Sequence, residues 1–347
     1  MRPWEANIRK VVPYVPGDQP GGDKLIKLNT NENPYPPAPG AIRALRELET
    51  DRLRKYPDPA ASMLVEALAG YYGVGSDQVF VGVGSDDVIA MSFLTFFNSD
   101  KPVLFPDITY SFYKVWADLY RIPYDTPALD GDFNIIPEDY EKENGGVIFP
   151  NPNAPTGIYM PLEQVEGILK ANQDVVVIVD EAYHYFYDKT FLPKISEYDN
   201  VVLIRTFSKL FSLASCRLGF IAGNETLIRY IWNVRPTFDT NAVALKFGEH
   251  FLSEPGLCEH LVAVEREGRE YLKASLREHG YEYFAENGNY AFIRVKTSVS
   301  QVKERLEEKK ILIKTYGQEM LKDYIRISTG SRRVMEQFTE ALYEVDR

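Results

Sequence analysis

Features that mark several common protein classes are scarce in this sequence or missing from it. Only two cysteines occur, Cys216 and Cys258, without a CxxC motif or a ladder of pairs, which favours a reducing compartment. The apolar runs are far shorter than the roughly 18 residues that indicate a membrane span, and the N-terminus lacks the apolar core of a signal peptide. We therefore expect a cytoplasmic protein that does not cross a membrane.

Motifs for metals, nucleotides and nucleic acids are missing too. The four histidines are widely scattered, with no HExxH motif and no Cys/His cluster, so we expect no metal site. No GK[ST] occurs, which excludes a P-loop. The formal net charge is −11, and no block rich in lysine and arginine offsets it, so a general nucleic-acid binder is not expected.

What the sequence does contain is an alternation of short β-branched runs with helical patterns. The runs cover residues 79–83, 102–105, 146–149, 175–179, 201–204 and 219–222. This pattern predicts an α/β domain with three layers, a mostly parallel sheet covered by helices on both faces. After about residue 240, a long amphipathic stretch and then alternating segments predict a smaller α+β domain. We expect a large domain over residues 30–240, and a small domain made of an N-terminal arm, 1–29, with residues 241–347.

Polar residues follow these runs at the positions where the strands should end. The turns are residues 84–87, 107–110, 151–153, 180–183 and 205–209. Ligands bind beyond the carboxyl ends of the strands in open α/β sheets, so these turns are the candidates for a site. Each has an ordinary structural explanation as well. The turn at 84–87 and Asp180 can cap helices, and Lys209 can be a surface lysine.

The combination is more informative than its parts. Lys209 follows Ser208 between two apolar residues, with Arg217 eight positions further on. A partly buried lysine near another cation loses its proton more readily and can then condense with an aldehyde. Pyridoxal phosphate needs such a lysine, a carboxylate for its ring nitrogen and a pocket for its phosphate. Lys209, Asp180 and the turn at 84–86 would supply all three at one edge of one sheet.

Taken with these residues, the chain resembles the fold-type I pyridoxal-phosphate aminotransferases of the class II subfamily, and among them the histidinol-phosphate aminotransferases. The matching motifs are residues 31–35, 55–59, 82–86, 155–157, 179–183, 205–209, 217–220 and 325–328, in the family's order. The resemblance covers nearly the whole chain and implies the fold of aspartate aminotransferase.

The resemblance also implies roles for the matching residues. Catalysis would depend on Lys209, which binds the cofactor aldehyde and moves the proton, on Asp180, which holds the ring nitrogen, and on Tyr183, which hydrogen-bonds the phenolic oxygen. The other cofactor contacts would be Ser85, Asp86, Tyr110, Asn153, Ser208 and Arg217, with Tyr56 reaching the cofactor of a partner subunit in a homodimer with shared active sites. The substrate, an amino donor or a 2-oxo acid, would meet Tyr14, Asn31, Lys314 and Arg326.

Three positions depart from the family pattern. Ala154 stands where an asparagine normally touches the phenolic oxygen, and Asn153 is the candidate substitute. Lys314 replaces a second substrate-side arginine, which keeps the charge and loses the bidentate geometry. Ser215 and Cys216 replace the usual Gly-Leu before Arg217, with no consequence that the sequence reveals.

The activity implied by the resemblance is transamination between L-histidinol phosphate and 2-oxoglutarate, which gives imidazole acetol phosphate and glutamate in histidine biosynthesis. An aromatic amino-acid aminotransferase and a threonine-phosphate decarboxylase would share nearly all of these motifs. The residues found at 205–209 and 324–328, around Lys209 and Arg326, favour the first activity. A relative that binds the cofactor but only regulates is disfavoured, because Lys209 is present and residues 1–40 leave no room for a helix-turn-helix.

Overall fold

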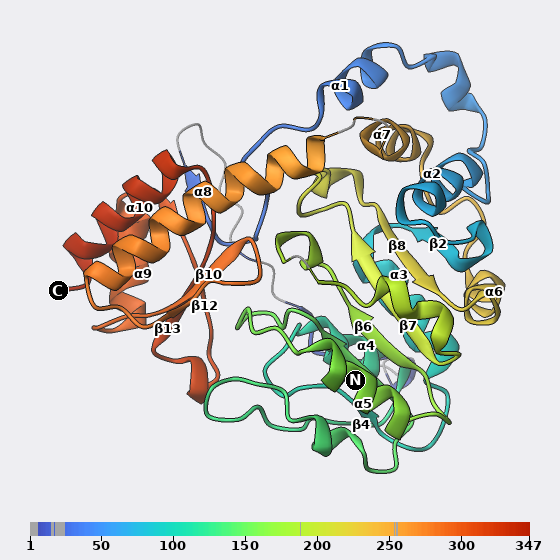
Figure 1. Cartoon of the computed structure of the whole chain (residues 1–347), viewed down its shortest axis with the longest axis horizontal. Coiled ribbons are helices and arrows are strands. Elements are labelled where there is room, and N and C mark those ends of the chain that lie inside the picture. Colours follow the sequence, from blue (N-terminus) through green and yellow to red (C-terminus); the bar gives the residue numbers. More distant parts are fainter. Residues whose placement is uncertain (1–5, 15–16, 18–24, 188, 253, 255) are drawn as a thin grey trace.

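The structure is a computed structural model that describes residues 6–14, 17, 25–187, 189–252, 254 and 256–347. Parts of the predicted N-terminal arm, residues 1–5, 15–16 and 18–24, lie outside the described residues. Figure 1 shows two bodies, one built around a large sheet and one, on the left, in which C-terminal helices pack on a small sheet. The strand β1 (Ile26–Lys27) joins the C-terminal body by pairing in parallel with β11 (Ile311–Leu312).

A seven-stranded sheet forms the larger body, in the order β2-β8-β7-β6-β5-β3-β4. Its strands are β2 (Val79–Gly82), β3 (Val103–Leu104), β4 (Tyr124–Asp125), β5 (Gly146–Pro150), β6 (Val177–Asp180), β7 (Val201–Thr206) and β8 (Gly219–Gly223). Strand β8 runs antiparallel to both of its neighbours, and the other strands are parallel to one another. Each of the six β-branched runs is therefore a strand, as predicted, and β4 is a strand that the sequence analysis missed.

Helices cover both faces of this sheet, which confirms the expected three layers. One face packs on α3 (Gly84–Phe96), α4 (Phe112–Tyr120) and α6 (Glu225–Val234). The opposite face packs on α2 (Ser62–Tyr72), α5 (Leu162–Ala171) and α7 (Ala242–Leu252). Side chains alternate along each strand, so Ile178 belongs to the first core while Val177 and Val179 belong to the second. Both faces are buried, which explains the continuous apolar runs.

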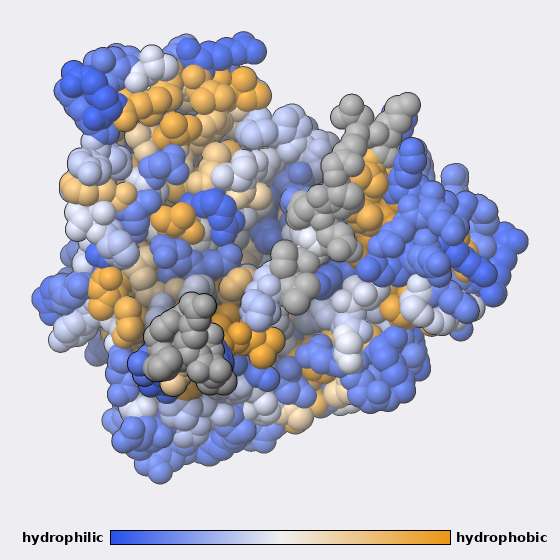
Figure 2. All heavy atoms as spheres, turned by 180° about the vertical axis from the view of Figure 1, so that it is seen from behind, coloured by the Kyte–Doolittle hydropathy of each residue, from blue (hydrophilic) through white to orange (hydrophobic). Residues whose placement is uncertain are grey.

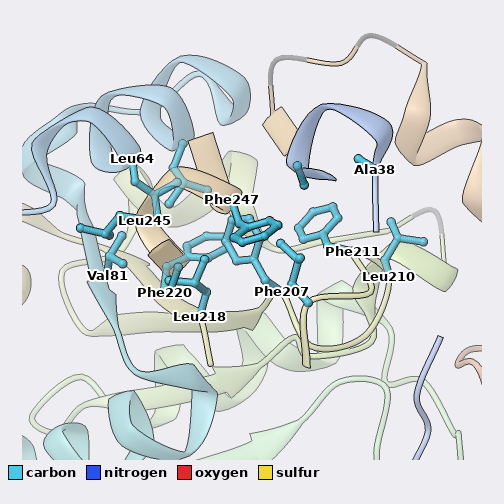
Figure 3. Close-up of a cluster of buried hydrophobic side chains, with 14 of the residues drawn as sticks. Ala38, Leu64, Val81, Phe207, Leu210, Phe211, Leu218, Phe220, Leu245 and Phe247 are labelled. Carbon is cyan, nitrogen blue, oxygen red and sulfur yellow. The ribbon is translucent and has the colours of Figure 1, made fainter. Parts of the chain in front are cut away.

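A cluster of aromatic and aliphatic side chains fixes the turn that follows β7. Phe207, Leu210 and Phe211 are fully buried, although they flank Lys209 on both sides. Figure 3 shows them packed together with side chains from β8 and from α7, among them Phe220 and Phe247. Because three buried residues anchor this turn, the backbone that carries Lys209 has little freedom to move.

The C-terminal body is a four-stranded antiparallel sheet covered by three helices. The sheet has the order β12-β13-β10-β9, with β9 (Tyr283–Phe284), β10 (Tyr290–Arg294), β12 (Lys314–Thr315) and β13 (Tyr324–Ser328). The helices are α8 (Leu257–Glu278), α9 (Val299–Glu308) and α10 (Arg332–Val345). Their apolar faces and the strands form a core of their own, which includes Leu272, Ile325 and Phe338.

The amphipathic stretch after residue 240 is divided between the two bodies. Helix α7 packs on α2 and on α1 (Pro39–Arg46), and Leu245 belongs to the core of the larger body. The boundary predicted at residue 240 thus falls before a helix of that body, and we propose that the small domain begins with α8. None of the helices in the described part of the chain is both long and apolar enough to cross a membrane. The cytoplasmic location stays a prediction.

Candidate active site

A cavity of about 520 Å³ lies where the carboxyl ends of the sheet strands meet the C-terminal body. Seven of the residues predicted for the site line it: Tyr14, Asn31, Tyr110, Tyr183, Lys209, Lys314 and Arg326. They come from the N-terminal arm, the turns after β3, β6 and β7, and the strands β12 and β13. The fold therefore gathers at one place residues that are up to about 300 positions apart in the sequence.

Lys209 has its amino group at the wall of this cavity. Its Nζ donates a hydrogen bond of 3.3 Å to the backbone oxygen of Thr30 and lies 5.6 Å from the centre of the Tyr183 ring. In the part of the chain that the structure describes, the amine contacts a neutral carbonyl and an aromatic face, so a carbonyl compound in the cavity can reach it. Lys209 is thus half-buried just after a buried strand, and it lines the cavity.

Asp180 is the last residue of β6, and its carboxylate is buried. Tyr113 donates a hydrogen bond of 2.7 Å to Oδ2, and the backbone N–H of Ala182 donates one of 3.1 Å to Oδ1. Burial nevertheless raises the pKa of Asp180 to about 6, although these two donors and the charge of Lys209 act in the opposite direction. A buried carboxylate of this kind is stabilised by a cationic partner such as a protonated ring nitrogen.

The predicted phosphate residues meet at the N-terminus of α3. Arg217 forms an ion pair of 3.0 Å with Asp86 and donates a 3.4 Å hydrogen bond to Ser208 Oγ. Gly219 lets β8 approach this N-terminus closely: a Cβ at this position would lie 2.3 Å from the backbone carbon of Gly84 and 2.4 Å from the nitrogen of Ser85. A helix N-terminus beside an arginine and a serine is suited to a phosphate dianion.

Tyrosines form much of the remaining wall. Tyr110 donates a hydrogen bond to Asp86, and burial raises its pKa well above the usual range. Tyr183 Oη accepts a hydrogen bond of 3.0 Å from Asn31 Nδ2. Tyr14 stacks on Phe112 with 4.4 Å between the ring centres, which attaches the described part of the arm to α4. These rings give the cavity aromatic walls, each with a polar hydroxyl group at its end.

Arg326 is a half-buried cation whose partners are mostly neutral. Its Nη2 donates a hydrogen bond of 2.8 Å to the oxygen of Asn29, and its guanidinium lies 5.8 Å from the Tyr290 ring. Its Nε is buried and has no hydrogen-bond partner among the residues that the structure describes. An unpaired buried donor is costly, so the site is prepared for an anion. Lys314 lines the same cavity.

Two predicted residues have surroundings other than this cavity. The Asn153 amide donates to the oxygen of Ile108 at 3.0 Å and accepts from Thr109 Oγ1 at 3.1 Å, so the loop already uses both of its ends. Tyr56 is 81% exposed and stacks on Phe238, away from this cavity. The first arrangement gives no support to Asn153 as a cofactor contact, and the second leaves Tyr56 free to meet another molecule. Both roles stay predictions.

Sequence reasoning missed several residues of the site. Tyr113, which bonds Asp180, lies three positions after Tyr110, and that helical spacing was the available signal. Lys114 and Asp118, one further turn apart on α4, line the outer part of the cavity. Thr30 contributes only a backbone oxygen, for which no sequence signal exists. Within the described ranges, no group of three or more His, Cys, Asp or Glu residues could hold a metal ion.

The residues present fit pyridoxal phosphate. A lysine amine, a buried carboxylate with a raised pKa, and a glycine-bordered helix N-terminus with an arginine adjoin one cavity. These are the three groups that the aldehyde, the ring nitrogen and the phosphate of this cofactor require. The site thus has the chemistry of an enzyme that acts on amines.

Comparison with known proteins agrees with this chemistry. The sequence profile of the family described as "Aminotransferase class I and II" matches residues 23–342. The chain belongs to this family.

Relatives with assigned names are similar over nearly their entire length. Histidinol-phosphate aminotransferase 1 of Hydrogenovibrio crunogenus is 40% identical, with 99% of this chain and 97% of that protein covered. The histidinol-phosphate aminotransferase of Lactococcus lactis subsp. cremoris is 39% identical, with coverage of 98% and 97%.

Solved structures share the fold. Histidinol-phosphate aminotransferase from Sinorhizobium meliloti, in complex with pyridoxal-5'-phosphate, has a TM-score of 0.86 at 23% identity, with 93% of this chain and 92% of that chain covered. L-threonine-O-3-phosphate decarboxylase from Porphyromonas gingivalis has a TM-score of 0.80 at 19% identity, with coverage of 92% and 99%. The fold alone therefore does not separate these two activities.

Proposed function

We propose that the protein is a pyridoxal-phosphate-dependent aminotransferase that transfers the amino group of L-histidinol phosphate to 2-oxoglutarate in histidine biosynthesis. The observation that carries the proposal is the single cavity that presents Lys209 and Arg326, with Asp180 and Arg217 beside it. The full-length similarity to histidinol-phosphate aminotransferases at about 40% identity supports this choice of substrate.

Different residues of the site would have different roles in the reaction. When bound, pyridoxal phosphate supplies an aldehyde that condenses with amines and a ring that withdraws electrons from the neighbouring carbon. Asp180 keeps the ring nitrogen protonated, because a cation beside it stabilises the buried carboxylate. Lys209 Nζ is the base that takes the proton from the carbon bearing the amine. Arg217, Ser208 and the N-terminus of α3, which lie together, would anchor the phosphate and so orient the ring.

The anionic end of each substrate would bind at Arg326. This guanidinium has a buried Nε with no partner in the described part of the chain, and it can take the carboxylate of glutamate or the phosphate of histidinol phosphate in turn. The tyrosine walls suit a flat imidazole ring. Lys314 at the same cavity contributes a second cation, without the planar fork of an arginine.

A homodimer with shared sites is part of this proposal. Tyr56 is exposed, and so are Ile42 and Leu45 on α1, Leu53 just before Tyr56 and Met63 on α2. Figure 2 shows hydrophobic side chains gathered at the upper left, over the end of the molecule where α1 lies. An exposed apolar patch of this kind supports contact with a second copy.

The proposal is tested by following the visible absorption of the cofactor-loaded protein during single-turnover addition of one amine at a time. We expect histidinol phosphate to bleach the band fastest, ahead of phenylalanine and of threonine phosphate. Faster bleaching by phenylalanine would assign the chain to the aromatic aminotransferases. Release of carbon dioxide from threonine phosphate would assign it to the decarboxylases.

A substitution isolates the role of Lys209. Lys209→Ala should remove the visible band and lower turnover by at least about a thousandfold, because both the amine and the base are lost. The matched control is Lys142→Ala, which removes a lysine paired on the surface with Asp125 and should leave both properties unchanged. Unchanged turnover in Lys209→Ala would remove this residue from the mechanism.

A further inference from the structure

The segment of residues 28–31 joins the two bodies of the protein through its backbone. Its four consecutive carbonyl oxygens all accept hydrogen bonds from groups at or beside the site. In order along the segment, the donors are Ser328 N (2.7 Å), Arg326 Nη2 (2.8 Å), Lys209 Nζ (3.3 Å) and Asn289 Nδ2 (3.0 Å). Three of these donors belong to the C-terminal sheet or the turn before it, and Lys209 belongs to the larger body.

Asn31 closes this segment, and its side chain reaches across to the larger body. The residue is 1% exposed and has a φ of 54°, a left-handed conformation that asparagine tolerates better than most residues. Its backbone N–H donates to Ser328 Oγ at 2.7 Å, and its Nδ2 donates to Tyr183 Oη at 3.0 Å. Both of these contacts are short enough to be well-formed hydrogen bonds.

The direction of the second contact restricts the phenol. An amide N–H can only donate, so the oxygen of Tyr183 is the acceptor and its own hydrogen must point away from Asn31. On its other side Tyr183 faces the cavity that contains Lys209. The hydroxyl hydrogen is thus available to a group bound there.

We propose that Asn31 is a positioning residue that aims the Tyr183 hydroxyl at the phenolic oxygen of the bound cofactor, and that Ser328 and Asn289 make this aim depend on the position of the C-terminal body. The inference rests on the proposed function, because it concerns the same site. It gives Asn31 a task other than the substrate contact expected from the sequence.

The departure at Ala154 increases the importance of this contact. Ala154 is buried in the cavity wall and has no side-chain donor. The Asn153 amide is occupied by Ile108 and Thr109. Among the described residues, Tyr183 is then the side chain placed to donate to the phenolic oxygen.

A hydrogen bond to that oxygen has a measurable effect. The oxygen carries more negative charge after the cofactor-bound Nζ of Lys209 has lost its proton, so a donor stabilises the deprotonated form. Removing or misdirecting the donor must therefore raise the pH at which the visible absorption changes. Charged and titratable groups face Tyr183 from the surrounding elements: Tyr14, Tyr113, Lys209, Tyr290, Tyr316 and Arg326. None of these six groups is changed in the variants below.

The experiment is a pH titration of the visible absorption of the cofactor-loaded protein, with no substrate present. Tyr183→Phe removes the donor and should raise the midpoint by about one pH unit. Asn31→Gly keeps the left-handed backbone accessible and should raise it by about half a unit. Ser328→Ala and Asn289→Ala, which cannot touch the cofactor, should each raise it by a smaller amount.

The matched control is Asn287→Ala. Asn287 lies in the same turn as Asn289 and also bridges the two bodies, through a 2.9 Å bond to the oxygen of Gly157, but it does not lead to Tyr183. Its midpoint should equal that of the unmodified protein. Equal midpoints in the unmodified protein, Asn31→Gly and Ser328→Ala would overturn the inference, and so would a shift in Asn287→Ala as large as theirs. Absence of any visible band in the unmodified protein would contradict the proposed function instead.

Discussion

At the scale of the residue, burial destabilises the charged form of Asp180. Its pKa is about 6 in the folded chain, against 3.8 for an aspartate without these surroundings. Between pH 3.8 and about pH 6, the folded chain therefore keeps a proton on Asp180 that the unfolded chain has released. The contribution of Asp180 to stability without cofactor therefore falls as the pH rises through this window. Above about pH 6 the folded chain bears the full cost, roughly 3 kcal/mol at about 1.4 kcal/mol per pH unit.

Asp180→Asn should relieve this cost. We expect the cofactor-free variant to be more stable by about 2 kcal/mol at pH 8 and by much less at pH 4, because an amide carries no charge and still accepts from Tyr113. Denaturant unfolding at the two pH values, without cofactor, measures this difference. The same variant should bind the cofactor at least tenfold more weakly. Equal stability at both pH values would mean that the carboxylate is not strained by burial.

At the scale of the element, the approach of β8 to α3 decides whether a phosphate can be held. Gly219→Ala would place a methyl group 2.3 Å from the backbone of Gly84, and neither backbone can yield as a flexible side chain would. We expect cofactor affinity to fall more than tenfold, as measured by titration of the folded protein. Gly223→Ala on the same strand is the control, since its nearest neighbour, the oxygen of Val201, lies at 3.1 Å. Equal affinity in the two variants would contradict the role assigned to Gly219.

Elements with a strong pattern could be predicted from the sequence, and those defined by distant partners could not. The runs at 79–83 and 201–204 are buried on both faces, so composition alone marks β2 and β7. Strand β4 has two residues, only one of them apolar, and depends on its pairing with β3. Asp180 ends a buried strand and Lys209 comes shortly after one, and both were found for that reason. Thr30 and Asn31 act through backbone groups and through an amide whose partner is 152 residues away, so no pattern along the chain indicates these contacts.

At the scale of the whole molecule, the exposed side chains of α1 and its neighbours test the dimer. Leu45→Asp places a charge on a patch where Leu45 is 52% exposed, so the isolated chain should fold as before. We expect sedimentation to show loss of a dimer, and cofactor affinity to fall if Tyr56 serves the partner's site. Met320→Asp is the control, because Met320 is similarly exposed on the C-terminal body. A monomer in the unmodified protein would contradict the proposed assembly.

The bonds of the 28–31 segment also set the order in which a newly made chain becomes competent. Asn31 and Ser328 are separated by 297 residues, which a ribosome adds in roughly 15 to 60 s. During that interval the nascent chain can acquire Lys209 and Asp180 on a folded sheet, but the donors from β13 have not yet been synthesised. Until β13 is made, the segment lacks the partners that Arg326 and Ser328 provide. The active site is thus completed in one late step, when β13 emerges and binds the 28–31 segment, which was made much earlier.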